Sequence, residues 1–454
     1  MNDPGAPDPV PRQHAFPGEI LMGAQSRLIP YHIPLRFFIS AALFHVAAWL
    51  LLVAGYTDVA GYSGGPGFVL AALHALTLGV LAMTAMGAAY QLLNVATGIS
   101  ISMAIGRFDV SSLSSWFYIP GTVLLVAGMA EGNNAVMLLS GAMVVTGMVA
   151  FAVVVGTIFH RAVTLKITLR HGWAALICMV LLASAGLALI SDLELGFLSA
   201  AAFPDHADLA IGHAILGGFG FMGLFVLGFS YILVPMFALS SAPNDRHSKV
   251  SLNLVLVALA IAVPSALAGN VLAMSLAGVI GLAGVTVHLM LMCRVLRDGM
   301  KKRLGLSFVM VRSAWVALPL TIITGELAAV APEDFNLPSL FVFILIFGWL
   351  LTFLTGMLQR ILPFLTSMHA HKLGQRAPRL SEMGHQKVTL KLHAACHGSA
   401  LVLVSAGIVT NEDTMVLAGG LVGSLGAAAF LWFTLGVGKL VVGFHAKDTL
   451  AKQP

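Results

Sequence analysis

The 454-residue chain is 58% hydrophobic and only 9% charged, and its mean hydropathy is +0.94. Soluble domains carry about 25% charged residues, so this composition predicts a polytopic membrane protein surrounded by lipid. The 24 Lys and Arg against 19 Asp and Glu give a net charge of +5, but in a membrane chain the positions of charges matter more than their sum. We exclude nucleic acid as a partner. The three cysteines all lie in apolar stretches, which excludes a disulfide framework and a cysteine-based zinc site: Cys178, Cys293 and Cys396.

The two ends of the chain differ from its apolar body. Residues 1–34 are rich in Pro, Gly and polar residues and lack an apolar core, which predicts a flexible cytoplasmic tail rather than a signal peptide. We expect a membrane domain over residues 35–443 and a short cytoplasmic tail over residues 444–454.

Apolar runs along the chain predict the membrane spans. A spanning helix needs about 20 mostly apolar residues, and twelve segments meet this requirement. Gly269-Asn270 is the only break between the seventh and the eighth. In chain order the predicted spans are 35–55, 68–93, 113–130, 134–158, 172–191, 208–239, 250–270, 272–296, 310–330, 338–366, 388–410 and 414–443.

The distribution of charge predicts the orientation. With the N-terminus inside, alternating loops place all 24 basic residues in inner segments, whereas the outer loops contain acidic residues only. Positive residues gather on the cytoplasmic side of membrane proteins. The sequence therefore predicts an all-α protein of the cytoplasmic (inner) membrane with twelve helices and both termini in the cytoplasm.

Three of the predicted spans share a pattern of two glycines separated by seven residues. The second span contains GVLAMTAMGAAYQLLNV, the sixth GFMGLFVLGFSYILVPM and the tenth GWLLTFLTGMLQRILPF, and a Tyr or Gln follows three residues after the second glycine. The three spans lie four helices apart and run in the same direction. This spacing predicts three four-helix arcs around a pseudo-threefold axis; the alternative is that the glycines merely allow helices to approach closely.

Histidines are the candidate functional residues. Ionisable side chains inside a bilayer are costly and often mark function, although a neutral histidine bonded to a backbone carbonyl is a structural alternative for each one. We interpret His288 as a packing residue. Six histidines fall within predicted spans: His45, His74, His213, His288, His393 and His397.

The positions of these histidines suggest a haem or metal site. His74 and His213 lie thirteen and fifteen residues before the second glycine of their spans, so they occupy nearly equivalent slots near the outer surface. His393 and His397 are four residues apart and share one helix face. Imidazole is a common ligand of haem iron and copper. We predict His74, His397 and His393 as cofactor-binding residues and His213 and His45 as metal ligands, with His74 and His397 as the simplest haem-binding pair and His213 or His45 as the rival partner.

The spans lack groups that drive ion coupling. No carboxylate or lysine lies in the middle of any predicted span, whereas proton pumps and sodium-coupled carriers keep such a group in the membrane interior. This absence weakens the interpretation of the chain as a pump or carrier.

These features resemble a known superfamily. Twelve helices with both ends inside, three arcs, and a histidine near the outer end of the second and sixth helices resemble the catalytic subunit of haem-copper oxidases and of nitric oxide reductases. The segments HALTLGVLAMTAMGAAYQLLNV and HAILGGFGFMGLFVLGFSYILVPMF look like divergent subunit I-like proteins, similar to the NnrS family, which is associated with haem, copper and tolerance of nitric oxide.

The resemblance implies roles for particular residues and also shows departures. It implies that His74 binds a low-spin haem and that His213 binds a second metal. The His-x-His motif of the tenth helix is replaced by Phe341-Val342-Phe343, the paired histidines of the seventh helix are absent, and Gly217 stands where the family has a tyrosine. These departures argue against oxygen reduction and proton pumping.

We therefore expect a membrane protein that binds haem b, with copper as a second candidate cofactor, and that acts in electron transfer or in the response to nitric oxide. A respiratory electron donor or a cytochrome subunit is the expected partner. Two alternatives stay open. One is a channel or transporter for a metal, haem or a small neutral solute, and the other is an assembly factor of a respiratory complex.

Overall fold

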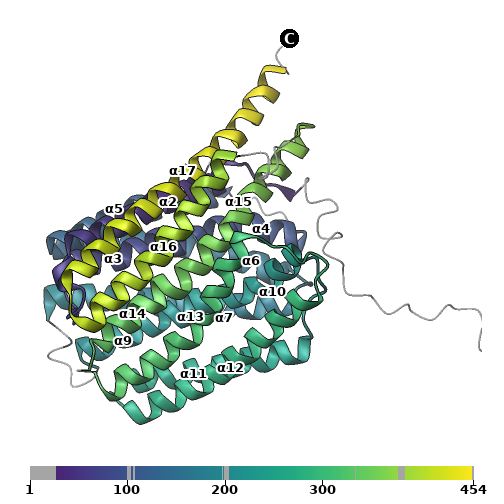
Figure 1. Cartoon of the computed structure of the whole chain (residues 1–454). Coiled ribbons are helices and arrows are strands. Elements are labelled where there is room, and N and C mark those ends of the chain that lie inside the picture. The colour runs from purple at the N-terminus through teal and green to yellow at the C-terminus, as the bar shows by residue number, and fades with distance from the viewer. Residues whose placement is uncertain are drawn as a thin grey trace, which may run out of the picture.

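The computed structural model describes residues 27–99, 104–105, 108–196, 198, 204–332, 334–376 and 384–451. Within this part of the chain, twelve helices are long and apolar enough to cross a membrane, which confirms the predicted number (Figure 1). Most of the predicted N-terminal tail, residues 1–26, lies outside the described residues. The last helix, by contrast, continues to Ala451, past the boundary predicted at residue 443.

Nine of the described spans are single helices. The break predicted between the seventh and eighth is present: Gly269 has a φ of +59°, and the Asn270 side chain accepts a hydrogen bond from the Ala273 backbone N–H. Outside the spans, a short 3-10 helix η2 (Tyr56–Asp58) and two antiparallel strands, β1 (Ala104–Ile105) and β2 (Phe108–Asp109), lie in loops. The nine helices are α2 (His32–Ala54), α5 (Val110–Glu131), α6 (Asn134–Arg161), α7 (Lys166–Leu195), α11 (Asp245–Leu267), α12 (Val271–Asp298), α13 (Leu306–Val330), α16 (Gly384–Thr410) and α17 (Asp413–Ala451).

The three spans that carry the paired glycines are interrupted by π-helical segments. Each π segment has eight residues and begins twelve residues before the second glycine of its span. The sequence did not reveal these segments, because a π segment leaves the apolar composition of a span unchanged. The three spans are α3 (Phe68–His74), η3 (Ala75–Ala82) and α4 (Met83–Thr97); α9 (His206–Ile215), η4 (Leu216–Gly223) and α10 (Leu224–Ala238); and α14 (Leu337–Phe343), η5 (Ile344–Leu351) and α15 (Thr352–Lys372).

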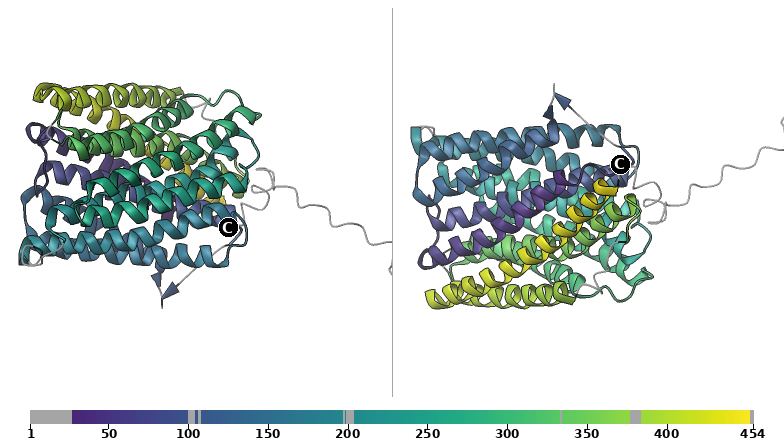
Figure 2. Two further views of the ribbon diagram at one scale, coloured as in Figure 1. Left: turned by 90° about the horizontal axis from the view of Figure 1, so that it is seen from below. Right: turned by 90° about the horizontal axis from the view of Figure 1, so that it is seen from above.

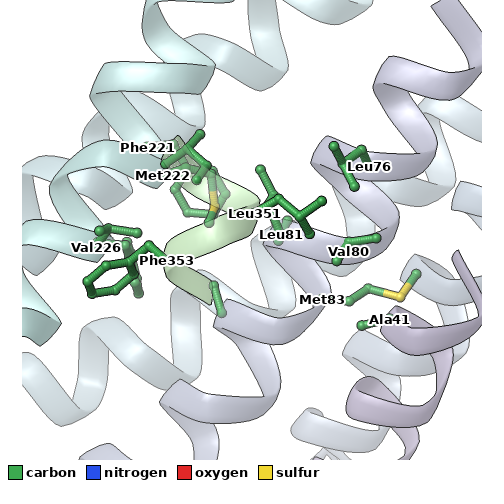
Figure 3. Packing of buried hydrophobic residues seen from close by; sticks show 14 of the residues in the cluster. Ala41, Leu76, Val80, Leu81, Met83, Phe221, Met222, Val226, Leu351 and Phe353 are labelled. Atoms are coloured by element: carbon green, nitrogen blue, oxygen red, sulfur yellow. The ribbon is translucent and has the colours of Figure 1, made fainter. Parts of the chain in front are cut away.

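The π segments meet at the centre of the bundle, where each of the three contacts the other two. The apolar windows of the three interrupted spans are at least 61% buried, against at most 50% in every other described span. Figure 3 shows the packing there, with Leu81, Met222 and Leu351 converging from the three helices. All three side chains are buried, so hydrophobic packing closes the centre.

The nine uninterrupted helices surround these three. Following the contacts from α2, the order is α2, α5, α6, α7, α11, α12, α13, α16, α17 and back to α2. In both views of Figure 2 the helices of the bundle run side by side along roughly one direction. The structure is therefore a closed ring of helices around a buried inner group.

Three hydrogen bonds recur at matching places in the ring. Each joins a polar side chain on one helix to the carbonyl of a glycine 33 residues later on the next helix. The pairs are Ser114 Oγ with Gly147 at 3.0 Å, Ser251 Oγ with Gly284 at 2.8 Å, and His393 Nδ1 with Gly426 at 3.1 Å. The same contact thus forms between α5 and α6, between α11 and α12, and between α16 and α17.

A second recurring contact joins each inner span to a neighbouring helix. The Tyr or Gln three residues after the second glycine faces a residue that also packs against that glycine. The ring centroids of Tyr90 and Phe37 lie 5.7 Å apart, those of Tyr231 and His171 lie 5.4 Å apart, and Gln359 Nε2 lies 3.0 Å from Met310 Sδ. The shared glycine pattern therefore corresponds to shared packing.

Both described ends of the chain lie on one face of the bundle. The rings of Tyr31, which precedes α2, and His445, near the end of α17, stack at 4.3 Å. Lys372, at the end of α15, donates a hydrogen bond to the Leu28 carbonyl at 3.5 Å. We call the face that holds these contacts the inner end, and the opposite face the outer end.

Candidate histidine sites

The two histidines predicted to occupy equivalent slots lie next to each other at the outer end of the bundle. His74 is the last residue of α3, directly before η3, and His213 lies in the last turn of α9, just before η4. Their ring centroids are 6.3 Å apart with 25° between the ring planes. Because η3 and η4 are in contact, the packing of the two inner spans brings these imidazoles together. We call His74 and His213 the outer pair.

Hydrogen bonds determine which nitrogen of each outer imidazole carries the proton. His74 Nδ1 lies 3.0 Å from the Leu70 carbonyl and His213 Nδ1 lies 3.2 Å from the Leu182 carbonyl. A carbonyl accepts and never donates, so each Nδ1 carries the hydrogen and each Nε2 keeps a free lone pair. This arrangement, with one ring nitrogen held by a carbonyl and the other open, is typical of metal-binding histidines.

The third inner span contributes no imidazole at this level. Its matching slots hold Phe341 and Phe343, and Phe341 stacks on Phe219 with ring centroids 6.4 Å apart. Two of the three inner spans, and not the one that contains α14, therefore contribute an imidazole at this level.

The other three predicted residues form a second cluster in the interior. His45 on α2, His393 and His397 on α16 are 1%, 0% and 3% exposed, and we call them the buried triad. The ring centroids of His45 and His393 are 5.7 Å apart, as are those of His393 and His397. Phe430 of α17 packs against His393 and His45, with ring centroids 4.8 and 6.0 Å apart, so an aromatic ring covers two members of the triad.

The predicted pairing of His74 with His397 is not among the contacts of the described residues. His74 lies beside His213, whereas His397 Nε2 lies 2.7 Å from the hydroxyl of Thr352 at the start of α15. Position along the chain predicts the depth of each histidine but not the direction in which its ring points, so it did not distinguish these partners.

The number of imidazoles in each cluster limits which groups that cluster could hold. Among the described residues, no group of three or more His, Cys, Asp or Glu side chains converges to hold a metal ion. A haem iron already has four nitrogens from the porphyrin and needs only one or two protein ligands. With metal–nitrogen bonds of about 2.0 Å, the separation within the outer pair is close to the upper limit for two imidazoles on one ion. The outer pair therefore fits haem ligation better than the buried triad does.

Two further histidines were not recognised from the sequence as candidate residues. His171 and His288 are fully buried and flank Tyr231, with ring centroids 5.4 and 5.2 Å from the tyrosine ring. His171 immediately precedes the predicted span 172–191, and we interpret His288 from the sequence as a packing residue. Alignment of the three repeats would have singled them out, because the matching residues beside Tyr90 are Phe37 and Phe151.

Comparison with known proteins leaves the family of the chain open: no protein-family model matches it, and no curated protein is significantly similar to it.

Proposed function

We propose that the chain is an integral membrane protein that binds haem b and acts in electron transfer or in the response to nitric oxide and related respiratory stress. The observation that carries this proposal is the outer pair. His74 and His213 come from two inner spans, lie 6.3 Å apart, and both hold their Nδ1 hydrogen on a backbone carbonyl.

The proposed architecture is three four-helix arcs related by a pseudo-threefold axis, as in the haem-copper oxidase superfamily. Three features support it: the π segments in equal register, the hydrogen bonds that each span 33 residues, and the closed ring of nine helices. We further propose that the chain lies in the inner membrane with both termini in the cytoplasm, because the basic residues then all lie inside.

The residues of the outer pair would position the cofactor. When bound, haem supplies a one-electron iron couple. The carbonyls of Leu70 and Leu182 fix the two ring orientations and raise the basicity of the opposite nitrogens. A site at the outer end suits electron exchange with a respiratory donor or cytochrome subunit, because a protein that donates electrons can approach this end from the aqueous phase.

The absence of internal carboxylates supports a protein that does not pump protons. In the sequence no Asp, Glu or Lys lies at the middle of a span, and such groups mark proton and ion pathways. We therefore do not propose oxygen reduction coupled to proton translocation.

The test is the absorption spectrum and metal content of the detergent-purified chain. We expect a Soret band, split bands on reduction, and a pyridine haemochrome of the b type, with all three lost in His74→Ala and in His213→Ala. Matched controls are His160→Ala, which changes an exposed histidine at a helix end, and His45→Leu, which changes the buried triad. Both controls should keep the bands. A colourless protein without iron would refute the proposal. Stoichiometric copper without haem would show that the cofactor is copper and not haem.

A channel or transporter is the main alternative. The buried side chains of Leu81, Met222 and Leu351 close the centre of the bundle, which weighs against an open path along the axis. Solute flux in liposomes that survives removal of haem and metals would favour this alternative. Co-purification with another respiratory subunit, without any bound cofactor, would favour an assembly factor.

A further inference from the structure

The buried triad has a hydrogen-bonding pattern that the proposed haem site does not use. Each of its three imidazoles has one ring nitrogen engaged and one buried nitrogen without a hydrogen-bond partner among the described residues: His45 Nδ1, His393 Nε2 and His397 Nδ1. Among the described residues, these rings contact aromatic, hydroxyl and carbonyl groups and no carboxylate. A buried imidazole without an opposite charge stays neutral, because the charged form is strongly disfavoured in an apolar interior.

The hydrogen-bond partner of His45 determines which ring nitrogen of His45 carries the proton. The indole N–H of Trp49, which can only donate, points to His45 Nε2 at 3.3 Å. His45 Nε2 is therefore an acceptor, and the neutral ring carries its hydrogen on Nδ1. Consequently the free group of His45 is an N–H donor, and His45 can bind a metal only if it gives up Trp49 or loses a second proton.

The partners of the other two rings leave lone pairs instead. His393 Nδ1 donates to the Gly426 carbonyl at 3.1 Å, so its free Nε2 is an acceptor. The Thr352 hydroxyl uses its hydrogen on the Phe347 carbonyl at 2.9 Å, so it accepts from His397 Nε2–H at 2.7 Å. The free Nδ1 of His397 is therefore an acceptor as well.

The matching positions in the other repeats have no such surplus. Ser114 and Ser251 occupy the place of His393 and bond to the equivalent glycine carbonyls, but a serine has no second ring nitrogen. Four residues further on, where α16 has His397, α5 has Tyr118, whose hydroxyl donates to the Leu78 carbonyl at 3.2 Å. At these matching positions, only the histidines of α16 thus leave buried nitrogen atoms without a hydrogen-bond partner among the described residues.

We infer that the buried triad binds one small neutral molecule that donates two hydrogen bonds and accepts one, the chemistry of water or ammonia. Such a molecule would donate to His393 Nε2 and His397 Nδ1 and accept from His45 Nδ1–H. Ring centroids 5.7 Å apart suit a bridge made of two hydrogen bonds of about 2.8–2.9 Å. Buried waters typically make 2–4 bonds of this kind to otherwise unsatisfied groups, whereas a cation would enter an apolar site without a compensating charge.

The inference is independent of haem binding and is tested on the full chain in lipid bilayers. Solid-state NMR of the chain labelled with ¹⁵N-histidine should show His45 and His393 protonated at Nδ1 and His397 protonated at Nε2. Signals are assigned by loss in His45→Leu, His393→Ser and His397→Tyr, and the last two substitutions introduce the residues found at the matching positions of α5. Magnetisation transfer from water to the three rings should be present in the native chain and fall to background in His393→Ser.

Two arms identify the occupant and can overturn the inference. In water without added ammonium, magnetisation transfer from water protons to the three rings supports a resident water. A new cross-peak to these rings after addition of ¹⁵N-ammonium at alkaline pH supports ammonia. A different proton pattern, a charged imidazole, or no transfer from either molecule would refute the site. Stoichiometric copper or zinc that disappears in His393→Ser, with lone-pair nitrogens shifted by the metal, would also refute it.

Discussion

Tyr90 and Tyr231 stand at matching positions of two inner spans, yet one lies between two phenylalanines and the other between two histidines. The ring of Tyr90 contacts Phe37 at 5.7 Å and Phe151 at 5.5 Å. The backbone frame is the same in both places, because Phe151 and its counterpart each lie four residues after the glycine that accepts the recurring hydrogen bond. The repeat therefore keeps its framework while its side chains diverge.

The site around Tyr231 contains imidazole nitrogens that need hydrogen-bond partners, whereas the phenylalanines around Tyr90 have no such atoms. His171 Nδ1 bonds the Ile167 carbonyl at 2.9 Å and His288 Nδ1 lies 3.2 Å from the Tyr231 hydroxyl. The Nε2 atoms of both rings are buried without a partner among the described residues. Burying an unpaired polar group costs about 1–3 kcal/mol on the scale of protein mutations, so a comparison of the two sites measures how well the imidazoles are compensated.

The largest expected effect comes from breaking the frame that both sites share. A Cβ at Gly147 would meet Tyr118 Cβ at 2.6 Å and the Ser114 carbonyl at 2.9 Å, whereas a Cβ at Gly443 would meet nothing within 4 Å. Gly147→Val should lower the free energy of unfolding by about 3 kcal/mol or more, since overpacking of rigid backbone cannot relax. Detergent unfolding curves test this, with Gly443→Val as the control; equal losses in both variants would contradict the proposed close contact.

The next test converts the apolar site toward the polar one. Phe151→His places one imidazole beside Tyr90. The second neighbour of Tyr90 remains Phe37, where the polar site has His171. We expect a loss of about 1–3 kcal/mol from burial of an unpaired polar group, measured by the same unfolding curves. A neutral result would mean that Tyr90 or a buried water satisfies the new ring.

The reverse substitution should have a smaller effect. His288→Phe removes the hydrogen bond with Tyr231 and also removes the unpartnered Nε2, so the two contributions offset each other. We expect a change within about 1 kcal/mol. A loss as large as that of Phe151→His would show instead that His288 has a stabilising partner beyond Tyr231.

The smallest effects concern the recurring hydrogen bonds. Ser114→Ala and Ser251→Ala each remove one bond to a glycine carbonyl, and each should cost about 0.5–1.5 kcal/mol. Because the two bonds occupy matching places, the two losses should agree within about 0.5 kcal/mol. A clear inequality would show that the two helix pairs are not equivalent in energy.

The sequence predicted the helices well because span length and apolar composition are local properties. The break at Gly269-Asn270 and the paired glycines can both be recognised in the amino-acid sequence, and the structure confirms the twelve spans. The glycine pattern coincides with recurring packing of the inner spans, and the three-arc arrangement that it predicts stays a proposal.

The partners of the histidines were harder to predict, since they depend on how each helix is rotated. Depth along the chain placed His74 and His397 in the membrane, but only packing shows that one lies beside His213 and the other beside Thr352. His171 and His288 were missed because single residues carry no repeat signal until the three units are superposed. Whether the outer pair binds haem stays a prediction.

The π segments have a consequence for how the two halves of each inner span relate. A π turn is an extra residue within an α-helix, and one residue corresponds to about 100° of rotation. The outer part of each span is therefore turned about its axis relative to the inner part, so residues such as His74 and Tyr90 cannot be assigned to common faces by counting. The face on which a residue of an inner span lies therefore depends on which side of the π segment it stands, and not only on its distance along the chain.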